Sequence, residues 1–167
     1  MNTHQIHHIL SNESTTRKFF QGVYPSDRVP KNPPKPAAFV ANLDPHNSGG
    51  SHWVAFYLPS HGPAEYYDSY GTLPIPPFKK LLGQNYKRSI RTLQSPFSAV
   101  CGQYCIFFIL KRCNGQSMHD IISTFGEDVT ENDFILNYYI KNRFDIDLDV
   151  FDLPHLLQQI SKAKTKE

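Results

Sequence analysis

The stretch "LQSPFSAVCGQYCIFFILKRC", residues 93–113, sets a cysteine between small and flexible residues and follows it with a run of apolar ones. Ser98 is a favourable N-cap and Gly115 a favourable stop, so the pattern predicts a helix over 98–115. Apolar side chains occur nearly all round this helix, which is typical of a helix in the middle of a core. The sequence therefore predicts a buried central helix with Cys101 near its N-terminus.

The size and composition of the chain fit one ordinary globular domain. The 167 residues include 40% hydrophobic and 19% charged residues. This length supports one sizeable core, so we expect a single domain over 1–167, with 163–167 as a frayed tail. A formal charge of +2 neither requires nor excludes a polyanionic partner.

No segment of the sequence predicts a membrane or secretory location. The longest apolar run, Cys105–Leu110, is far shorter than the ~20 residues of a membrane span. The N-terminus lacks a basic region followed by an apolar core, so it does not predict a secretory signal. Three cysteines cannot all pair, which favours reduced thiols in the cytosol or nucleus. Cys101 and Cys105 lack CxxC spacing, so no zinc site is expected.

The remaining pattern predicts strands first and helices after them. A proline-rich stretch, 25–37, predicts an extended surface connection. The predicted strands are Ala38–Leu43, His52–Leu58, Ala64–Asp68 and Arg88–Thr92, and the other predicted helices are Gln5–Asn12, Met118–Phe125, Glu131–Arg143 behind Thr130 as cap, and Leu153–Lys162. This order favours one α+β domain.

A cysteine at the start of a helix has altered chemistry. The free N–H groups and the positive end of the helix dipole favour the thiolate, and they offer a donor to a developing oxyanion. Gly102 would leave space for a substrate carbonyl, although glycine costs about 1 kcal/mol in a helix relative to alanine. The alternative is that Cys101 is a small buried hydrophobe, as most free cysteines are.

Among the eight histidines, His52 is the best candidate for a base. The other seven fall in loops, on amphipathic helices or in the polar N-terminal segment. His52 instead opens "HWVAFYL", a strand that is apolar on both faces and is therefore expected at the centre of a sheet. A histidine at the end of such a strand has rigid surroundings at an edge where clefts form.

The next predicted strand brings a carboxylate to this histidine. "PSHGP", residues 59–63, predicts a hairpin turn. A loop centred on His61 sets His52 opposite Tyr70 and makes Asp68 its diagonal neighbour on the same face. Asp68 could then orient the imidazole. Alternatively, Asp68 simply begins a surface turn, and a register shift of one residue would separate the two side chains.

Three motifs together resemble a known protease family. "GGSHWVAFYLP", "YYDSYG" and "LQSPFSAVCGQYCIFF" resemble the adenovirus-type cysteine endopeptidases (adenain), and more closely their relatives in Maverick/Polinton transposons and related viruses. "FFQGVYPSDRVP" and "FVANLDPHNSGG" extend the resemblance, which runs from about Phe19 to Leu110. It implies the papain-like/Ulp1-like fold, a mixed, mostly antiparallel sheet packed by helices, with the nucleophile at the start of the central helix.

The resemblance also implies roles for particular residues. Cys101 would be the nucleophile and His52 the general base and then acid. Asp68 would orient His52, and Gln94 would supply a side-chain donor to the oxyanion hole beside the backbone N–H of Cys101. Trp53 would shape the wall next to His52, or it could be plain core, and Gly102 would lie in the substrate groove.

The implied activity is hydrolysis of peptide bonds after glycine-containing motifs, in capsid or core precursors during virion maturation. The implied enzyme is a monomer in the host cytoplasm or nucleus, or packaged in the virion. No cofactor is required by the sequence, but family members suggest a peptide or DNA activator. No cysteine lies between Asp68 and Gln94, so a disulfide-linked activator is not expected. The basic clusters 87–91 and 162–166 could contact DNA or form solvated surface.

Three alternatives remain open from the sequence. A protease that removes SUMO or ubiquitin-like modifiers shares the residue order and a Gly-Gly preference. Such enzymes usually place the glutamine one residue nearer the cysteine and an acidic residue before it, where this chain has Val100. A catalytically silent peptide-binding protein could keep the same fold. Acyl transfer to an amine would use the same side chains.

Overall fold

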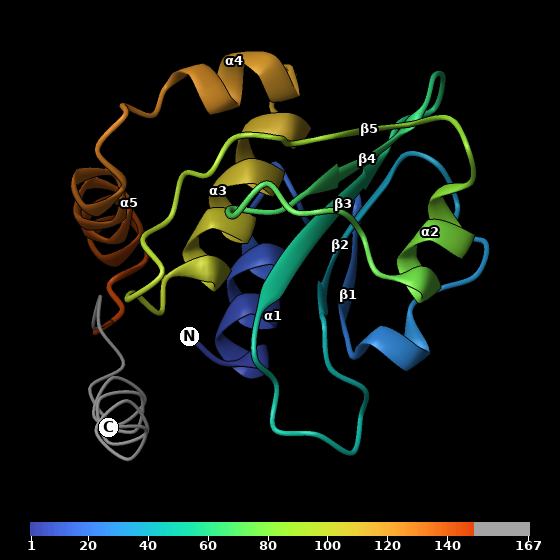
Figure 1. Ribbon diagram of the computed structural model, residues 1–167, viewed down its shortest axis with the longest axis horizontal. Coiled ribbons are helices and arrows are strands. Elements are labelled where there is room, and N and C mark those ends of the chain that lie inside the picture. Colours follow the sequence, from blue (N-terminus) through green and yellow to red (C-terminus); the bar gives the residue numbers. More distant parts are fainter. Residues whose placement is uncertain (149–167) are drawn as a thin grey trace, which may run out of the picture.

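The computed structural model describes residues 1–148 as a five-stranded mixed sheet with helices on both faces (Figure 1). The predicted helix Leu153–Lys162 and the tail 163–167 lie outside the described residues. In chain order the elements are α1 (Thr3–Asn12), β1 (Phe20–Tyr24), η1 (Ser26–Arg28), β2 (Ala37–Asn42), β3 (Trp53–Leu58), β4 (Ala64–Tyr67), α2 (Pro76–Leu82), β5 (Tyr86–Arg88), α3 (Cys101–Cys113), α4 (Met118–Ser123) and α5 (Val129–Phe144).

The strands lie in the order β1-β2-β3-β4-β5. The inner pairs β2–β3 and β3–β4 are antiparallel, and the outer pairs β1–β2 and β4–β5 are parallel. Ala55 pairs with Tyr67 and Tyr57 with Glu65. Continued by one and by three residues from the Ala55–Tyr67 pair toward the start of β3, this register sets Asp68 opposite Val54 and Tyr70 opposite His52, so the predicted hairpin register is confirmed.

Alternation along the central strands divides the core between the two faces of the sheet. Val40 and Ala55 face the larger cluster, which packs against α1, α3, α4 and α5. Phe39, Val54 and Phe56 face the smaller cluster, which α2 covers from the other side (Figure 1). Helix α3 is buried along most of its length, as its apolar pattern predicts. Within residues 1–148, no helix is long and apolar enough to cross a membrane.

Three elements were not expected from the sequence, and one strand is shifted. The strand β1 and the short helix α2 lie in stretches to which the pattern gave no element, and the 3₁₀ helix η1 lies in the stretch 25–37, which was predicted to be extended. The predicted strand Arg88–Thr92 is wrong in position, because β5 covers Tyr86–Arg88. Its partner β4 ends at Tyr67, so the chain leaves the sheet soon afterwards.

Two predicted helix caps are also wrong. Helix α3 begins at Cys101 and not at Ser98, because the Ser98 hydroxyl donates to the carbonyl of Ser95 and accepts from Gln94 within a turn of the preceding loop. Helix α5 is capped by Asp128 in place of Thr130. The Asp128 carboxylate accepts from two backbone N–H groups of the first turn, at 2.9 and 3.1 Å.

Candidate active site

Three elements bring His52, Asp68 and Cys101 together. His52 directly precedes β3, Asp68 directly follows β4, and Cys101 is the first residue of α3. The hairpin register places His52 beside Asp68, and the ring of Tyr70 stacks on the imidazole with centroids 4.8 Å apart. Asp68 is fully buried and His52 is 8% exposed. Asp68 and His52 are therefore held by the core, and Cys101 is half-buried beside them.

Asp68 is fixed on every side by hydrogen bonds. Its Oδ1 lies 2.6 Å from His52 Nε2 and accepts from the backbone N–H of Tyr70 at 3.0 Å. Its Oδ2 accepts from the backbone N–H of Thr72 at 3.1 Å and from the Thr72 hydroxyl. Burial raises the pKa of this carboxyl, but the bonds from His52, Thr72 and Tyr70 outweigh burial and hold the pKa below its usual value. Asp68 is thus an ionised, oriented partner for the imidazole.

The thiol of Cys101 interacts with the same imidazole, and both residues line one cavity. His52 and Cys101 are hydrogen-bonded, and because Asp68 holds Nε2, the nitrogen available to the thiol is Nδ1. Burial lowers the pKa of His52, but its bonds to Asp68 and Cys101 outweigh burial and raise the pKa to about 9.

The pKa of Cys101 shifts in the opposite direction. Burial raises it, yet the hydrogen bond and charge of His52, together with the backbone N–H of Trp53, lower it below its usual value. A lowered thiol pKa beside a raised imidazole pKa favours a thiolate–imidazolium pair. Such a pair is a nucleophile with a proton donor in contact with it.

Gln94 lies in the loop 93–100, which leads into α3. Its side chain is almost wholly buried, and its Oε1 accepts from the Ser69 hydroxyl at 2.6 Å. This contact turns Nε2 toward Ser98, whose carbonyl and hydroxyl oxygens both lie 3.2 Å away. A substrate oxygen would therefore accept from Gln94 Nε2 either together with Ser98 or in its place. The first N–H groups of α3, including that of Cys101, have no partner within the helix and are further donors.

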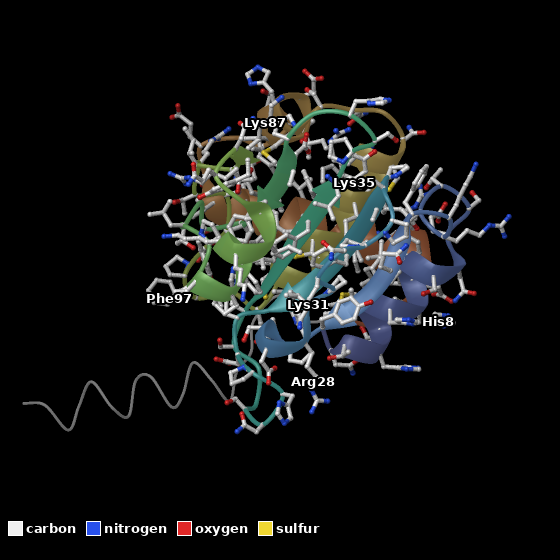
Figure 2. All side chains as sticks on the ribbon, turned by 90° about the vertical axis from the view of Figure 1, so that its right-hand side faces the viewer. His8, Arg28, Lys31, Lys35, Lys87 and Phe97 are labelled. Atoms are coloured by element: carbon white, nitrogen blue, oxygen red, sulfur yellow. The ribbon has the colours of Figure 1, made fainter. Side chains whose placement is uncertain are left out.

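A cavity of about 350 Å³ opens onto these groups, and it is lined by His52, Trp53, Tyr70, Gln94 and Cys101 among others. It adjoins a second cavity of about 260 Å³, with which it shares Thr3, Asn42, Gly49, Gly50 and Trp53. Together the two cavities form one groove, and Cys101 lines part of it. Phe97, also in the loop 93–100, is 61% exposed and lies at the edge of the molecule (Figure 2).

Of the two residues predicted to lie in the substrate groove, Trp53 lines the cavity and Gly102 does not. Trp53 forms a wall of the cavity, and its Nε1 donates to the carbonyl of Met1 at 3.3 Å. Gly102 is buried and does not line the cavity. A Cβ at Gly102 would lie 3.2 Å from atoms of Ile6 and Met1. The close approach of α1 is therefore the structural reason for a glycine here.

Several supporting residues were missed from the sequence. Ser69, Tyr70 and Thr72 all contact site residues, and their position directly after Asp68 could have indicated them. Asn132 and Asp133, on α5, contact the loop 93–100 from a distant part of the chain. Only their placement among the apolar residues of the buried helix face could have indicated them.

The described residues offer no metal site. No group of three or more His, Cys, Asp or Glu side chains within residues 1–148 is arranged to hold a metal ion. The chemistry that these residues can perform is nucleophilic attack by a thiolate, with proton transfer through one imidazole.

No protein-family model matches the chain, and no curated protein sequence matches it. Solved structures do. A crystal structure of the ASFV pS273R protease aligns over 81% of this chain and 65% of that one, at 19% identity and a TM-score of 0.57. The fold is that of this protease. The papain-like/Ulp1-like α+β fold expected from the sequence is thereby confirmed.

A selenomethionine crystal structure of the same protease aligns over 59% of this chain and 43% of that one, at 26% identity and a TM-score of 0.44. The chain thus spans less than two thirds of the length of either solved structure. The finer resemblance to adenain and to the Maverick/Polinton proteases stays a prediction.

Proposed function

We propose that this protein is a cysteine endopeptidase with Cys101 as nucleophile and His52 as its proton-transfer partner. The observation that carries the proposal is the ordered contact of the buried Asp68 and His52 side chains with the half-buried thiol of Cys101. Asp68 Oδ1 lies 2.6 Å from His52 Nε2, and the same imidazole is hydrogen-bonded to Cys101. The shared fold with a protease supports the same conclusion.

The reaction would begin with attack of the Cys101 thiolate on the carbonyl carbon of a peptide bond. The oxyanion of the tetrahedral intermediate would accept from Gln94 Nε2 and from the backbone N–H of Cys101. The proton on His52 Nδ1 would pass to the leaving amine as the C–N bond breaks and a thioester forms. Water would then attack the thioester carbon and give a proton to His52, and departure of the acid would restore the thiolate.

The substrate class follows from the resemblance and from the groove. We propose hydrolysis after glycine-containing motifs in capsid or core precursors of a virus or transposon, because the motifs around Cys101, His52 and Asp68 resemble enzymes of that kind. A peptide would reach the thiol through the cavity of about 350 Å³ beside Trp53. No cofactor enters this scheme, while activation by a peptide or by DNA, a monomeric state and a host-cell or virion location stay predictions.

Labelling of the thiol tests the proposal directly. We would treat the native protein with a Gly-Gly peptide aldehyde or vinyl probe and measure intact mass, and then assay hydrolysis of Gly-Gly peptides. We expect one adduct, lost in Cys101→Ala and His52→Ala and retained in the matched control Cys105→Ala. Failure to label the native protein, with and without added peptide or DNA, would overturn the proposal and favour the silent binding protein.

A parallel assay separates the remaining alternatives. Fluorogenic SUMO and ubiquitin-like substrates would be compared with unfolded Gly-Gly peptides at equal concentration. Faster turnover of the peptides supports an endopeptidase, and faster turnover of the folded modifiers would favour a deconjugating enzyme. Addition of a small amine nucleophile reports acyl transfer, since an amide product then replaces the free acid.

A further inference from the structure

The loop 93–100 is held in place from α5. The carbonyl of Leu93 accepts from the Tyr104 hydroxyl at 2.9 Å and from Asn132 Nδ2 at 3.2 Å. The backbone N–H of Ser95 donates to Asp133 Oδ2 at 3.0 Å. These two backbone groups flank Gln94, so side chains of α3 and α5 fix the segment that carries it.

Asp133 has unusual surroundings for a carboxyl group. It is 1% exposed, and within residues 1–148 no lysine, arginine or histidine forms an ion pair with it. The groups that face it are the Tyr104 hydroxyl of α3, the N–H of Ser95 and the side chain of Ser98, with the phenol of Tyr70 farther away. None of them carries a positive charge. A buried carboxylate without a counter-ion is costly. Burial raises the pKa of this group and outweighs the hydrogen bonds from Ser98, Ser95 and Tyr104, which act in the opposite direction.

The number of hydrogens available to these oxygens favours the neutral acid. The Tyr104 oxygen lies 2.9 Å from both Asp133 Oδ1 and the carbonyl of Leu93, and a hydroxyl has one hydrogen to donate. A protonated Oδ1 donates to the Tyr104 oxygen, whose hydrogen is then free for Leu93. Oδ2 still accepts from Ser95. In this form one continuous chain of hydrogen bonds joins α5 to both ends of the Gln94 segment.

We propose that Asp133 is a positioning residue that holds the loop 93–100, and with it the Gln94 amide, in place as a neutral carboxylic acid. Its effect on catalysis rests on the proposed function, because that function makes Gln94 an oxyanion donor. The effect of Asp133 on the stability of the fold does not rest on the proposed function. Displacement of a catalytic group by 1 Å costs about 100-fold in rate. A protein that lacks the contacts of Asp133 with the loop 93–100 therefore keeps its nucleophile and loses oxyanion stabilisation.

Two substitutions at one position test the clamp. In Asp133→Asn the amide reproduces the acid form, since its oxygen accepts from Ser95 and its NH₂ donates to Tyr104. In Asp133→Leu both contacts are lost at similar volume. Glu131→Gln makes the same change of carboxylate to amide at an exposed position of α5 and is the matched control. Tyr104→Phe removes only the bridging hydroxyl and serves if the leucine variant does not fold.

Hydrolysis and alkylation together distinguish positioning from general damage. We expect Asp133→Asn to keep kcat within about 3-fold and Asp133→Leu to lower it about 100-fold with KM little changed. We expect Tyr104→Phe to lower kcat about 10-fold, by the loss of one contact. Iodoacetamide alkylation of Cys101 forms no oxyanion, so its rate should stay within about 2-fold in every variant.

Unfolding as a function of pH reports the protonation state without any activity. A raised folded-state pKa means that the native protein binds more protons than the unfolded chain once pH exceeds the unfolded value of about 4. The contribution of Asp133 to stability should therefore fall as pH rises through that window, up to its raised folded pKa. Asp133→Asn removes this slope, and Glu131→Gln leaves it intact.

Some results would overturn the proposal. Equal losses of kcat in Asp133→Asn and Asp133→Leu would show that a charged carboxylate is needed. An alkylation rate that falls in parallel with hydrolysis would show that the whole site is disturbed. An unchanged pH slope of unfolding in Asp133→Asn would exclude the neutral acid. Absence of hydrolysis in the native protein would count against the proposed function, while the unfolding comparison would still decide the state of Asp133.

Discussion

Cys101 and Cys105 lie one turn apart on the same helix and differ in their chemistry. Burial raises the pKa of both thiols. At Cys105 nothing opposes burial, and its pKa lies well above the usual value. At Cys101 the hydrogen bond and charge of His52, with the backbone N–H of Trp53, reverse the effect and lower the pKa.

A third thiol, at the far end of α3, sharpens the comparison. Burial raises the pKa of Cys113 to about 11, although the neighbouring Arg112 acts in the opposite direction. The guanidinium of Arg112 is engaged by Glu65 at 2.7 and 3.1 Å, so it does not bond the thiol. A nearby cation that does not contact the thiol is therefore insufficient to lower the pKa of that thiol below its usual value. Activation of a buried thiol requires a donor in direct contact, and only the start of α3 provides one.

The largest effect should come from removal of that donor. His52→Ala leaves the Cys101 thiol with the backbone N–H of Trp53 as its remaining donor, so the pKa of the thiol should rise toward or above its usual value. We expect peptide hydrolysis to fall about 10³-fold and alkylation at pH 6 to become slower, because a thiol with a higher pKa holds less thiolate at that pH. Rates of iodoacetamide modification, read by mass, check this, with His61→Ala as an exposed control. An unchanged alkylation rate would contradict the assigned cause.

An intermediate effect is expected from the pH dependence. Hydrolysis needs the thiolate and the imidazolium together, so activity should appear as pH rises through the lowered pKa of Cys101 and decline as pH passes about 9. Asp68→Asn removes the bond and charge that raise the pKa of His52, so the alkaline limb should move to lower pH by about one unit or more. Profiles of kcat/KM against pH measure this, and an unmoved limb would exclude Asp68 as the cause.

The same pKa has a consequence for stability. A raised folded pKa of His52 means that its charged form is favoured by folding. This contribution is fully present below the unfolded value of about 6.5 and is lost as pH rises through about 9.

The smallest effect on activity is expected at Cys105. This thiol is 1% exposed within the larger core cluster, so Cys105→Ser places a hydroxyl among apolar side chains. We expect the free energy of unfolding to fall by about 1–3 kcal/mol and kcat to stay within about 2-fold. Urea unfolding and a peptide assay, corrected for the folded fraction, measure the two quantities. A loss of kcat comparable to that of Cys101→Ala would show that the two thiols are not separate in function.

Much of this arrangement could be predicted because it is local in sequence. The apolar pattern on all sides of 101–113 predicts a buried helix, and the turn at 59–63 fixes the hairpin register that brings His52 to Asp68. The predicted cap at Ser98 failed because a serine can bond a loop carbonyl as readily as a helix N–H. The prediction for Gly102 was wrong because the contact between α1 and this residue joins distant segments, and the pattern of apolar residues does not show it.

The sequence by itself determined the central hairpin with its register, the buried central helix, and the identity of the residues that could form a nucleophile and its base. Tertiary structure alone decided which thiol is activated and what holds Gln94 in place. The physical reason is that a pKa depends on contacts and burial within a few ångströms, and those contacts come from distant segments. Cys101 contacts His52 and Trp53, which lie about fifty residues earlier in the chain. Ser95 contacts Asp133, which lies 38 residues later.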